Sequence, residues 1–192
     1  MSDKLAKLKA KATTFRLREA LGAGLSRRDV YYYTQKGYIV RVAHGLYRFA
    51  DESESTDLQS ELKRLLLLCP QCVVGLHTAL KLFDLTDEIS AEIDLVAPTT
   101  NIPKRKLDGV KIHTAPPKLM KLGVTAENGI AVTTIERTLV ELLRKGEPLS
   151  TVLGVMRLAQ KKGMGIELTQ VKKLGDKFRV SKKVQTLLEA FL

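Results

Sequence analysis

The chain has 192 residues, of which 44% are hydrophobic and 28% charged, a composition typical of globular proteins. Its length suits one large domain or two small ones. No apolar run approaches the roughly 20 residues that a membrane span needs, and the lysine-rich start KLAKLKAKA lacks the apolar segment of a secretory signal. These features argue against a membrane-spanning or secreted protein, and we expect a cytoplasmic one.

The net charge of +11 is unevenly distributed along the chain. Residues 1–50 carry 11 basic side chains against 3 acidic ones, whereas residues 51–100 carry 3 against 10. The basic excess returns in residues 101–150, with 9 against 5, and in residues 151–192, with 9 against 3. A block as basic as the first is typical of proteins that bind an anion such as nucleic acid, although membrane-surface binders and plain solvated faces also show it.

The first 50 residues predict three helices followed by a β-hairpin. Segment 5–12 has the apolar spacing of an amphipathic helix, and a threonine at position 13 or 14 can cap a second helix that runs to about residue 21. The glycine-rich turn 22–24 then leads into a third helix, 26–36, and a hairpin follows at 38–49. This order is that of a winged helix-turn-helix, which we assign to residues 1–50.

The third helix has clear signals at both ends. Ser26 can accept a hydrogen bond from a free backbone N–H of the first turn, and Asp29 places negative charge near the positive end of the helix dipole. Gly37 stands where a helix commonly ends in a left-handed residue. The sequence therefore predicts a short capped helix between these residues.

The two faces of this helix differ in chemistry. At about 100° per residue, Val30, Tyr33 and Thr34 fall on a side that can pack. The opposite side holds Arg28, Tyr31, Tyr32 and Gln35. Arginine can bind guanine, glutamine can bind adenine, and tyrosine can contact a phosphate or a thymine methyl. Two of the tyrosines can instead be core residues, yet all five tyrosines of the chain lie within positions 31–47, which favours a functional surface.

The hairpin at 38–49 is predicted from its alternation of apolar and polar residues. The side chains expected to face inward are Val40, Val42, Tyr47 and Phe49, and those expected to face outward are Arg41 and Arg48. Ile39 and Leu46 break the alternation, so we expect both faces to be partly covered. Such a basic wing can follow the phosphates or enter the minor groove, and a merely solvated charged hairpin is the alternative.

Beyond the hairpin, the sequence predicts a mixed α/β domain at 58–192, so that the whole chain is α+β. The acidic segment 51–57 lacks periodicity and is expected to be the linker. Asn128-Gly129 predicts a hairpin turn, and Thr133 or Thr134 can cap the helix that follows. The other expected elements are helices at 58–69, 73–83, 149–162, 169–178 and 181–191 and strands at 91–98 and 110–117.

Two smaller motifs have modest signals. Cys69 and Cys72 form a lone CPQC without a second cysteine pair or a histidine at ligand spacing, so we expect two buried thiols rather than a zinc or redox site. Lys104, Arg105 and Lys106 lie together between the two expected strands. Such clusters are usually solvated, but this one can supply accessory phosphate contacts.

Four segments within roughly residues 13–160 stand out together: RRDVYYYTQKGYIVRVAHGLYRFAD, GLHTALKLFDLTDEISAEIDLVAP, GVKIHTAPP and LGVTAENGIAVTTIERTLVELL. In combination they resemble the AbiEi family, the antitoxin component of abortive-infection type IV toxin–antitoxin systems. The resemblance implies an N-terminal winged domain that represses its own operon and a C-terminal antitoxin domain. The implied toxin is nucleotidyltransferase-like and is opposed without a stable complex.

The resemblance also implies particular site residues. The DNA-binding positions are Arg27, Arg28, Tyr31, Tyr32, Gln35 and Lys36 in the recognition helix and Arg41, His44 and Arg48 in the wing. Glu136, Arg137 and Thr138 match the Glu-Arg-Thr signature of the family, with a structural or antitoxin role, while Glu141 stands where Asp is common. No cofactor or metal is implied.

Parts of the sequence are also compatible with two other functions. Glu92 and Asp94 alternate on one strand and, with Glu136, could form a metal-dependent nuclease or transferase site. However, no Glu-x-Lys follows Asp94, and His77 and His113 look isolated, so we expect no enzyme. An RNA-binding module is the remaining alternative, although a reading helix does not fit the deep major groove of A-form RNA.

Overall fold

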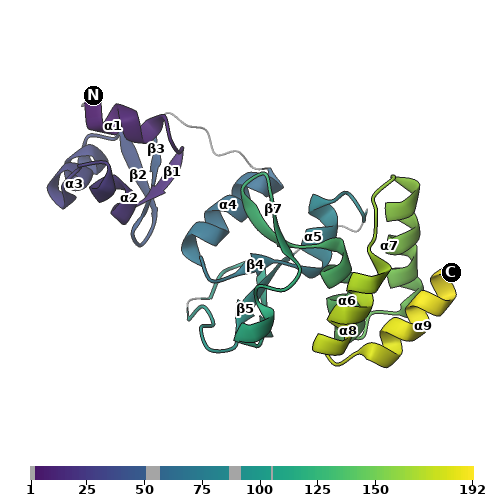
Figure 1. Ribbon diagram of the computed structural model, residues 1–192. Coiled ribbons are helices and arrows are strands. Elements are labelled where there is room, and N and C mark those ends of the chain that lie inside the picture. Colours follow the sequence, from purple (N-terminus) through teal and green to yellow (C-terminus); the bar gives the residue numbers. More distant parts are fainter. Residues whose placement is uncertain (1–2, 51–56, 87–91, 105) are drawn as a thin grey trace. The chain divides into compact units, whose positions relative to one another are not determined.

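The computed structural model describes residues 3–50, 57–86, 92–104 and 106–192. Contacts divide the chain into two compact units, Met1–Leu68 and Cys69–Leu192, each with its own sheet (Figure 1). The predicted α+β class is confirmed. The division keeps the helix Leu58–Leu68 with the first unit, whereas we expected a boundary at 51–57. Since residues 51–56 lie outside the described residues, that boundary stays a prediction.

The first unit has the element order of a winged helix-turn-helix. Its elements are α1 (Asp3–Lys9), β1 (Thr14–Arg16), α2 (Leu17–Gly22), α3 (Arg27–Gln35), β2 (Ile39–Ala43), β3 (Leu46–Phe49) and α4 (Leu58–Leu68). The three strands form one antiparallel sheet in the order β1-β3-β2. A small core joins helices and sheet: Leu5, Leu8, Phe15, Ala20, Leu25, Val30, Ile39 and Phe49 are all buried.

The second helix begins later than the sequence predicted. Residues 14–16 form strand β1, in which Phe15 pairs with Tyr47 of β3 and is fully buried. The backbone N–H of Arg16 donates a hydrogen bond to Glu19 Oε2 (2.5 Å), which caps α2 at this later point. The prediction of a threonine cap at 13 or 14 was therefore wrong, because residues 14–16 pair with β3 as a strand and the helix begins only after them.

The two faces of the wing differ from those predicted. Ile39 pairs with Phe49 and both are buried, whereas Val40 is 43% exposed. Because Val40 pairs with Arg48 and Arg41 with Tyr47, the two arginines lie on opposite faces of the sheet rather than together. A register shift between Arg41 and Ala43 then changes the alternation toward the tip.

The second unit is a five-stranded mixed sheet followed by a group of helices. Its elements are β4 (Val73–Val74), α5 (Leu76–Leu82), β5 (Ile93–Pro98), β6 (Val110–Ala115), the 3₁₀ helix η1 (Pro117–Leu119), β7 (Val124–Glu127), β8 (Ile130–Thr133), α6 (Ile135–Lys145), α7 (Leu149–Lys161), α8 (Leu168–Lys177) and α9 (Ser181–Phe191). The strand order is β6-β5-β4-β8-β7. The pairs β5–β6 and β4–β8 are parallel, and the other two pairs are antiparallel.

Most elements predicted for this unit are confirmed within one or two residues. Asn128 and Gly129 both have positive φ, +50° and +79°, as the predicted hairpin turn requires. The helix expected at 73–83 is the exception, because its first two residues form the central strand β4. Gly75 separates that strand from α5, and a Cβ at this position would lie 2.7 Å from a methyl of Val96, so the close approach requires glycine.

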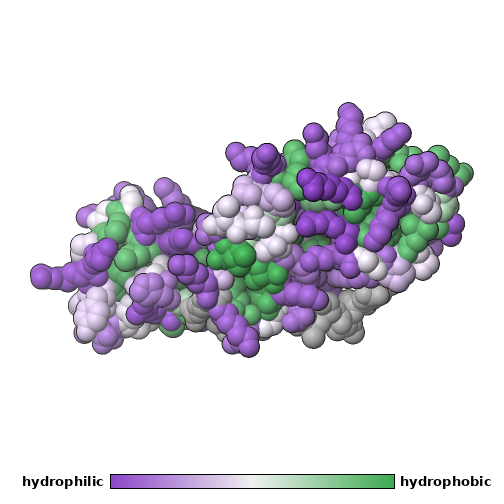
Figure 2. Space-filling model, turned by 90° about the horizontal axis from the view of Figure 1, so that it is seen from below, coloured by the Kyte–Doolittle hydropathy of each residue, from purple (hydrophilic) through white to green (hydrophobic). Residues whose placement is uncertain are grey.

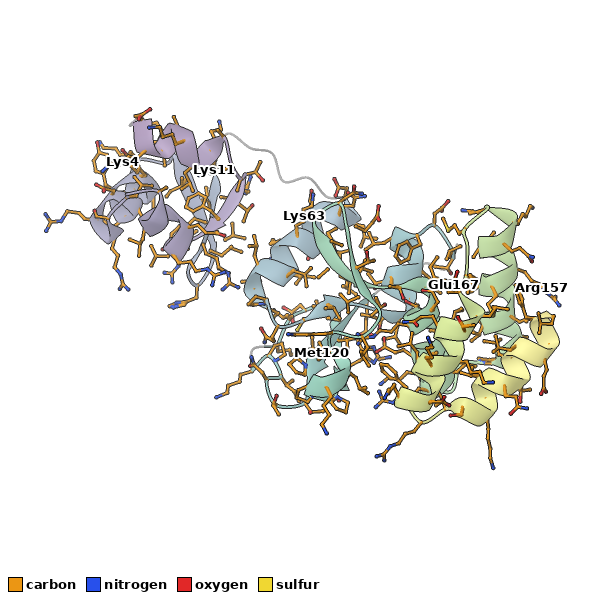
Figure 3. The ribbon with its side chains drawn as sticks, in the orientation of Figure 1. Lys4, Lys11, Lys63, Met120, Arg157 and Glu167 are labelled. Carbon is orange, nitrogen blue, oxygen red and sulfur yellow. The ribbon has the colours of Figure 1, made fainter. Side chains whose placement is uncertain are left out.

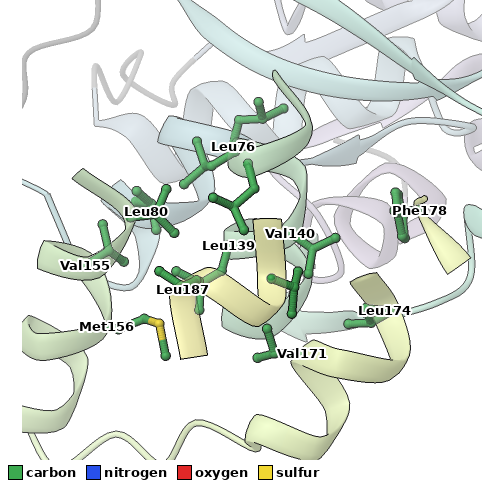
Figure 4. Packing of buried hydrophobic residues seen from close by; sticks show 14 of the residues in the cluster. Leu76, Leu80, Leu139, Val140, Val155, Met156, Val171, Leu174, Phe178 and Leu187 are labelled. Carbon is green, nitrogen blue, oxygen red and sulfur yellow. The ribbon is translucent and has the colours of Figure 1, made fainter. Parts of the chain in front are cut away.

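The main core of the second unit is built around α6, which contacts α5, α7, α8 and α9. Figure 4 shows apolar side chains from these helices meeting between them; Leu139, Val140, Val171 and Leu187 are all fully buried. Burying one such side chain stabilises the fold by about 1.5–3 kcal/mol. Hydrophilic residues make up most of the surface seen in Figure 2, with smaller hydrophobic patches between them.

Candidate nucleic-acid interface and buried polar cluster

Helix α3 is held by the cap that the sequence predicted. The Ser26 hydroxyl accepts a hydrogen bond from the Asp29 backbone N–H (3.1 Å), and Asp29 Oδ2 accepts from the Ser26 backbone N–H (2.7 Å). The hydrogen bond from the Ser26 backbone N–H, together with a second one from the Ser26 hydroxyl to Asp29 Oδ2 (2.8 Å), holds the pKa of Asp29 below its usual value. At the other end, Gly37 has a φ of +71° and the chain turns directly into β2.

The predicted faces of α3 are confirmed. Val30 is 2% exposed and packs into the core of the unit, and the Thr34 hydroxyl donates to the Val30 carbonyl (2.8 Å). Tyr31 and Tyr32 are 67% and 52% exposed, so neither is a core residue. The exposed residues of this helix and its end are Arg27, Arg28, Tyr31, Tyr32, Gln35 and Lys36. The helix therefore presents one continuous polar and aromatic face, hereafter the α3 face.

Ring contacts order part of the α3 face. The Tyr32 ring meets Tyr33 edge-on, with centroids 5.5 Å apart, and the Lys36 ammonium lies 5.9 Å from the Tyr32 centroid. Tyr33 in turn meets Tyr38 at 6.0 Å. Tyr38 is 50% exposed and was not among the predicted site residues. Because Tyr38 directly follows Gly37, which ends the helix, its contact with α3 could have been predicted from the sequence.

The wing brings together only part of its predicted site. At the tip, Arg41 Nη2 donates to His44 Nδ1 (2.9 Å), and both residues are exposed. A guanidinium can only donate, so the His44 nitrogen facing Arg41 is the acceptor in this pair. Arg48 is half-buried and lies on the other face of the sheet from Arg41. The tip can therefore meet a phosphate with Arg41, and Arg48 is the weaker candidate for contact.

The predicted accessory cluster lies in the second unit. Lys104 and Lys106 are exposed in the loop between β5 and β6. Arg105 lies outside the described residues. Both lysines can contact an anion from solvent. Among the described residues, however, no buried polar side chain without a partner lies in this loop, so the loop does not form a preformed anion-binding site.

The Glu-Arg-Thr signature connects α6 to its surroundings. Arg137 is fully buried, and its Nη1 donates to the carbonyls of Leu119, Met120 and Leu122 at 3.1, 3.1 and 2.7 Å. Met120 is labelled in Figure 3, beside η1. The Thr138 hydroxyl lies 2.7 Å from that of Thr133 on β8.

Glu136 makes the third connection of the signature. Its Oε1 accepts a hydrogen bond from the backbone N–H of Glu167 (3.2 Å), the residue that precedes α8 and is labelled in Figure 3. An acceptor at this place satisfies a free N–H at a helix start. The signature residues therefore join α6 to the loop after η1, to β8 and to α8, which is an architectural role.

Arg137 also forms a buried ion pair with Glu141. Its Nε and Nη2 donate to Glu141 Oε1 at 3.2 and 3.1 Å. The second oxygen of Glu141 has no hydrogen-bond partner among the described residues. Burial raises the pKa of Glu141, and the neighbouring Arg137 charge opposes that rise. Such a pair is costly to bury, because both charges lose their contact with water.

The acids considered for catalysis have other partners. Asp94 is buried, and its Oδ1 accepts from His113 Nε2 (2.7 Å) while its Oδ2 lies 3.8 Å from His77 Nδ1. The interpretation of His77 and His113 as isolated was therefore wrong. Within the described ranges, no three His, Cys, Asp or Glu side chains are grouped to hold a metal ion. Asp94 serves to join β5 to β6, and Glu136 is engaged elsewhere.

The cysteine prediction is confirmed in its structural part. Cys69 and Cys72 are 4% and 3% exposed and form no disulfide. Burial, with a smaller effect of Cys69, raises the pKa of Cys72 to about 12. A thiol with such a pKa is protonated at neutral pH and a poor nucleophile or metal ligand. Over the described part of the chain, no helix is both long and apolar enough to cross a membrane.

Helix α3 on a capped turn, followed by a basic hairpin, defines a winged helix-turn-helix, the class of protein in which transcriptional regulators are common. Residues 4–50 match the family model described as transcriptional regulator, AbiEi antitoxin. The resemblance drawn from the sequence is thus confirmed over this segment, which is similar to that family of regulators and antitoxins.

Comparison with solved structures extends the fold beyond the matched segment. A crystal structure of the RV2827C protein from Mycobacterium tuberculosis is similar over 97% of this chain and 79% of that chain, with a TM-score of 0.54 and 14% identity. At this identity the similarity concerns the fold alone. No curated protein matches the sequence. A role as a regulator or antitoxin therefore rests on the N-terminal segment.

Proposed function

We propose that this chain is a DNA-binding transcriptional autorepressor and the antitoxin of a toxin–antitoxin operon. The observation that supports this most is the α3 face, where exposed arginine, tyrosine, glutamine and lysine side chains stand on a capped helix beside a basic wing. Such a helix fits the major groove of B-form DNA, which is about 12 Å wide.

Different parts of the chain have different roles in this function. Residues 1–50 bind promoter DNA, residues 51–57 link the domains, and residues 58–192 act as the antitoxin domain. The toxin is a nucleotidyltransferase-like protein that is opposed without a stable complex, in the cytoplasm. No cofactor, metal or catalytic step is part of this proposal, in line with the match to a family of regulators.

The residues of the α3 face have different roles in the proposal. Arg28 and Gln35 contact base edges, because both can make paired hydrogen bonds to a base. Arg27, Lys36 and the tyrosine hydroxyls contact phosphates or bases beside them. In the wing, Arg41 supplies a phosphate contact at the tip, and His44 orients it through their hydrogen bond.

The test is fluorescence anisotropy of the protein with its promoter duplex, a scrambled duplex and an RNA hairpin, at about 50, 100 and 200 mM salt. We expect a preference for the promoter duplex that survives at the highest salt. Arg28→Ala and Gln35→Ala should each weaken promoter binding by about 1–3 kcal/mol and affect the scrambled duplex much less.

The matched control for Arg28→Ala is Arg18→Ala, which removes one exposed positive charge from α2. It should leave the promoter preference unchanged. If the control lowers the preference as much as Arg28→Ala, charge rather than the α3 face determines binding. Binding of the RNA hairpin in preference to both duplexes would favour the RNA-binding alternative.

A further inference from the structure

Helices α8 and α9 form a second helix-turn-helix-like pair, in the second unit. Helix α8 ends at Lys177 and α9 begins at Ser181, so only three residues connect them. The middle one, Arg179, has a left-handed φ of +60°. A turn of three or four residues between two crossing helices is the connection found in DNA-binding helix-turn-helix motifs.

The crossing of the two helices is fixed by close packing. A Cβ at Gly175 of α8 would lie 2.7 Å from a methyl of Val184 on α9, so only glycine fits here. The Ser181 hydroxyl donates to Asp176 Oδ1 (2.7 Å) across the turn. Helix α7 also contacts α9, and α6 contacts α8, so the pair stands on a packed helical base. The turn is therefore held in one geometry.

The outward face of α9 repeats the spacing of the α3 face. Buried Val184 and Leu187 mark its inner side. On the outer side the exposed residues at i, i+3, i+4 and i+7 are Lys182, Gln185, Thr186 and Glu189. Gln185 Nε2 donates to Glu189 Oε1 (2.9 Å), and Glu189 lies more than a turn beyond Lys182. The first two turns of α9 therefore offer cationic and amide donors, as recognition helices do.

The preceding helix and the turn add positive charge. Residues 168–192 contain six basic and two acidic side chains. One of the six, Lys183, donates to the Leu143 carbonyl (2.9 Å) and is used in the fold. The other five are exposed, and within the described residues none makes a hydrogen bond or ion pair through its side chain: Lys172, Lys173, Lys177, Arg179 and Lys182. Their charge is thus open to an external anion.

We propose that the α8–α9 pair is a second binding site for duplex DNA, with α9 in the major groove and the cations of α8 and the turn on the phosphates. Duplex DNA is favoured over RNA because the A-form major groove does not admit a helix. It is favoured over an acidic protein because the surface combines charge with a presented helix, the two features that groove binding uses. The site gives the second unit its own DNA contact and does not depend on the role of α3.

The test measures the salt dependence of binding of the full chain to a scrambled duplex of about 30 base pairs by fluorescence anisotropy. The test variant is Lys173→Ala/Lys182→Ala. Its matched control is Lys118→Ala/Lys121→Ala, which removes two exposed lysines from the region of η1. Far-UV circular dichroism and a thermal melt show whether each variant keeps its fold.

We expect the slope of log affinity against log salt to fall by about two for the test variant, since each lost phosphate contact removes roughly 0.9. Between about 50 and 200 mM salt, the wild-type affinity should thus drop about 12-fold more than that of the variant. The control should keep the wild-type slope. Lys173→Arg/Lys182→Arg keeps both charges and should keep it too.

Three outcomes would overturn the proposal. An unchanged slope for the folded test variant would mean that this pair does not contact DNA. An equal fall for test and control would mean diffuse charge rather than a site. Loss of RNA-hairpin binding with duplex binding intact would assign the surface to RNA. The role of α3 is tested separately, by promoter preference rather than by slope on scrambled DNA, so either proposal can fail alone.

Discussion

Replacing Arg137 by methionine is the sharpest test of how the second unit is held together. Methionine has a similar length and no charge, so the change removes the guanidinium while it keeps much of the volume. The guanidinium contacts Glu141 through two nitrogens and three loop carbonyls through a third. In Arg137→Met, the Glu141 carboxylate remains buried without its partner.

The expected loss of unfolding free energy is about 3–5 kcal/mol, because removing one partner of a buried ion pair leaves an uncompensated charge. Domains of this size have about 5–15 kcal/mol in total, so the variant should fold only marginally. In Arg137→Met/Glu141→Leu no charge is left buried. We expect this double variant to regain at least about 1 kcal/mol over the single one.

The loss should also depend on pH. Burial raises the pKa of Glu141 above its usual value, and Arg137, which opposes the rise, is absent from Arg137→Met. The folded variant therefore holds the proton more tightly than the unfolded chain does. Its stability is greatest below the unfolded pKa and falls as pH rises through the folded pKa, so the defect should be larger at about pH 8 than at about pH 5.

Urea denaturation followed by circular dichroism measures these differences by linear extrapolation. A loss below about 1 kcal/mol in Arg137→Met, or a double variant less stable than the single one, would refute the reasoning. Either result would mean that leaving Glu141 buried without Arg137 costs less unfolding free energy than we expect. A loss of stability that becomes larger toward acid pH would contradict a raised pKa of Glu141.

Three further predictions concern other parts of the chain. Ser26→Ala should lower stability by about 0.5–2 kcal/mol, measured by urea denaturation, because α3 loses its cap. Arg41→Ala should weaken promoter and scrambled duplexes alike and reduce the salt slope by about one, measured by anisotropy, while Arg48→Ala should do less because Arg48 is half-buried. Gly175→Ala should cost about 1–3 kcal/mol by overpacking against Val184, and a thermal melt without a shift would contradict that close approach.

Local signals in the sequence predicted much of both units. The cap at Ser26, the turn at Asn128-Gly129 and the apolar spacing of α6 each depend on residues within about one or two helical turns of each other, so a single stretch of sequence contains the whole signal. The outward chemistry of α3 was predictable for the same reason, because one buried valine determines which side faces out.

The pairings between residues that are distant in the sequence were decided only by the tertiary structure. Thr14–Arg16 forms a strand because β3, some 30 positions further on, supplies its partners, and a helical pattern in the segment cannot reveal that. Arg41 and Arg48 separate because a register shift in the wing changes the alternation. His113 joins Asp94, and Arg137 meets the carbonyls after η1, only once the sheet and helices are assembled. The sequence by itself thus determined most of the elements and the α3 face, whereas long-range packing decided strands β1 and β4 and which polar groups are buried together.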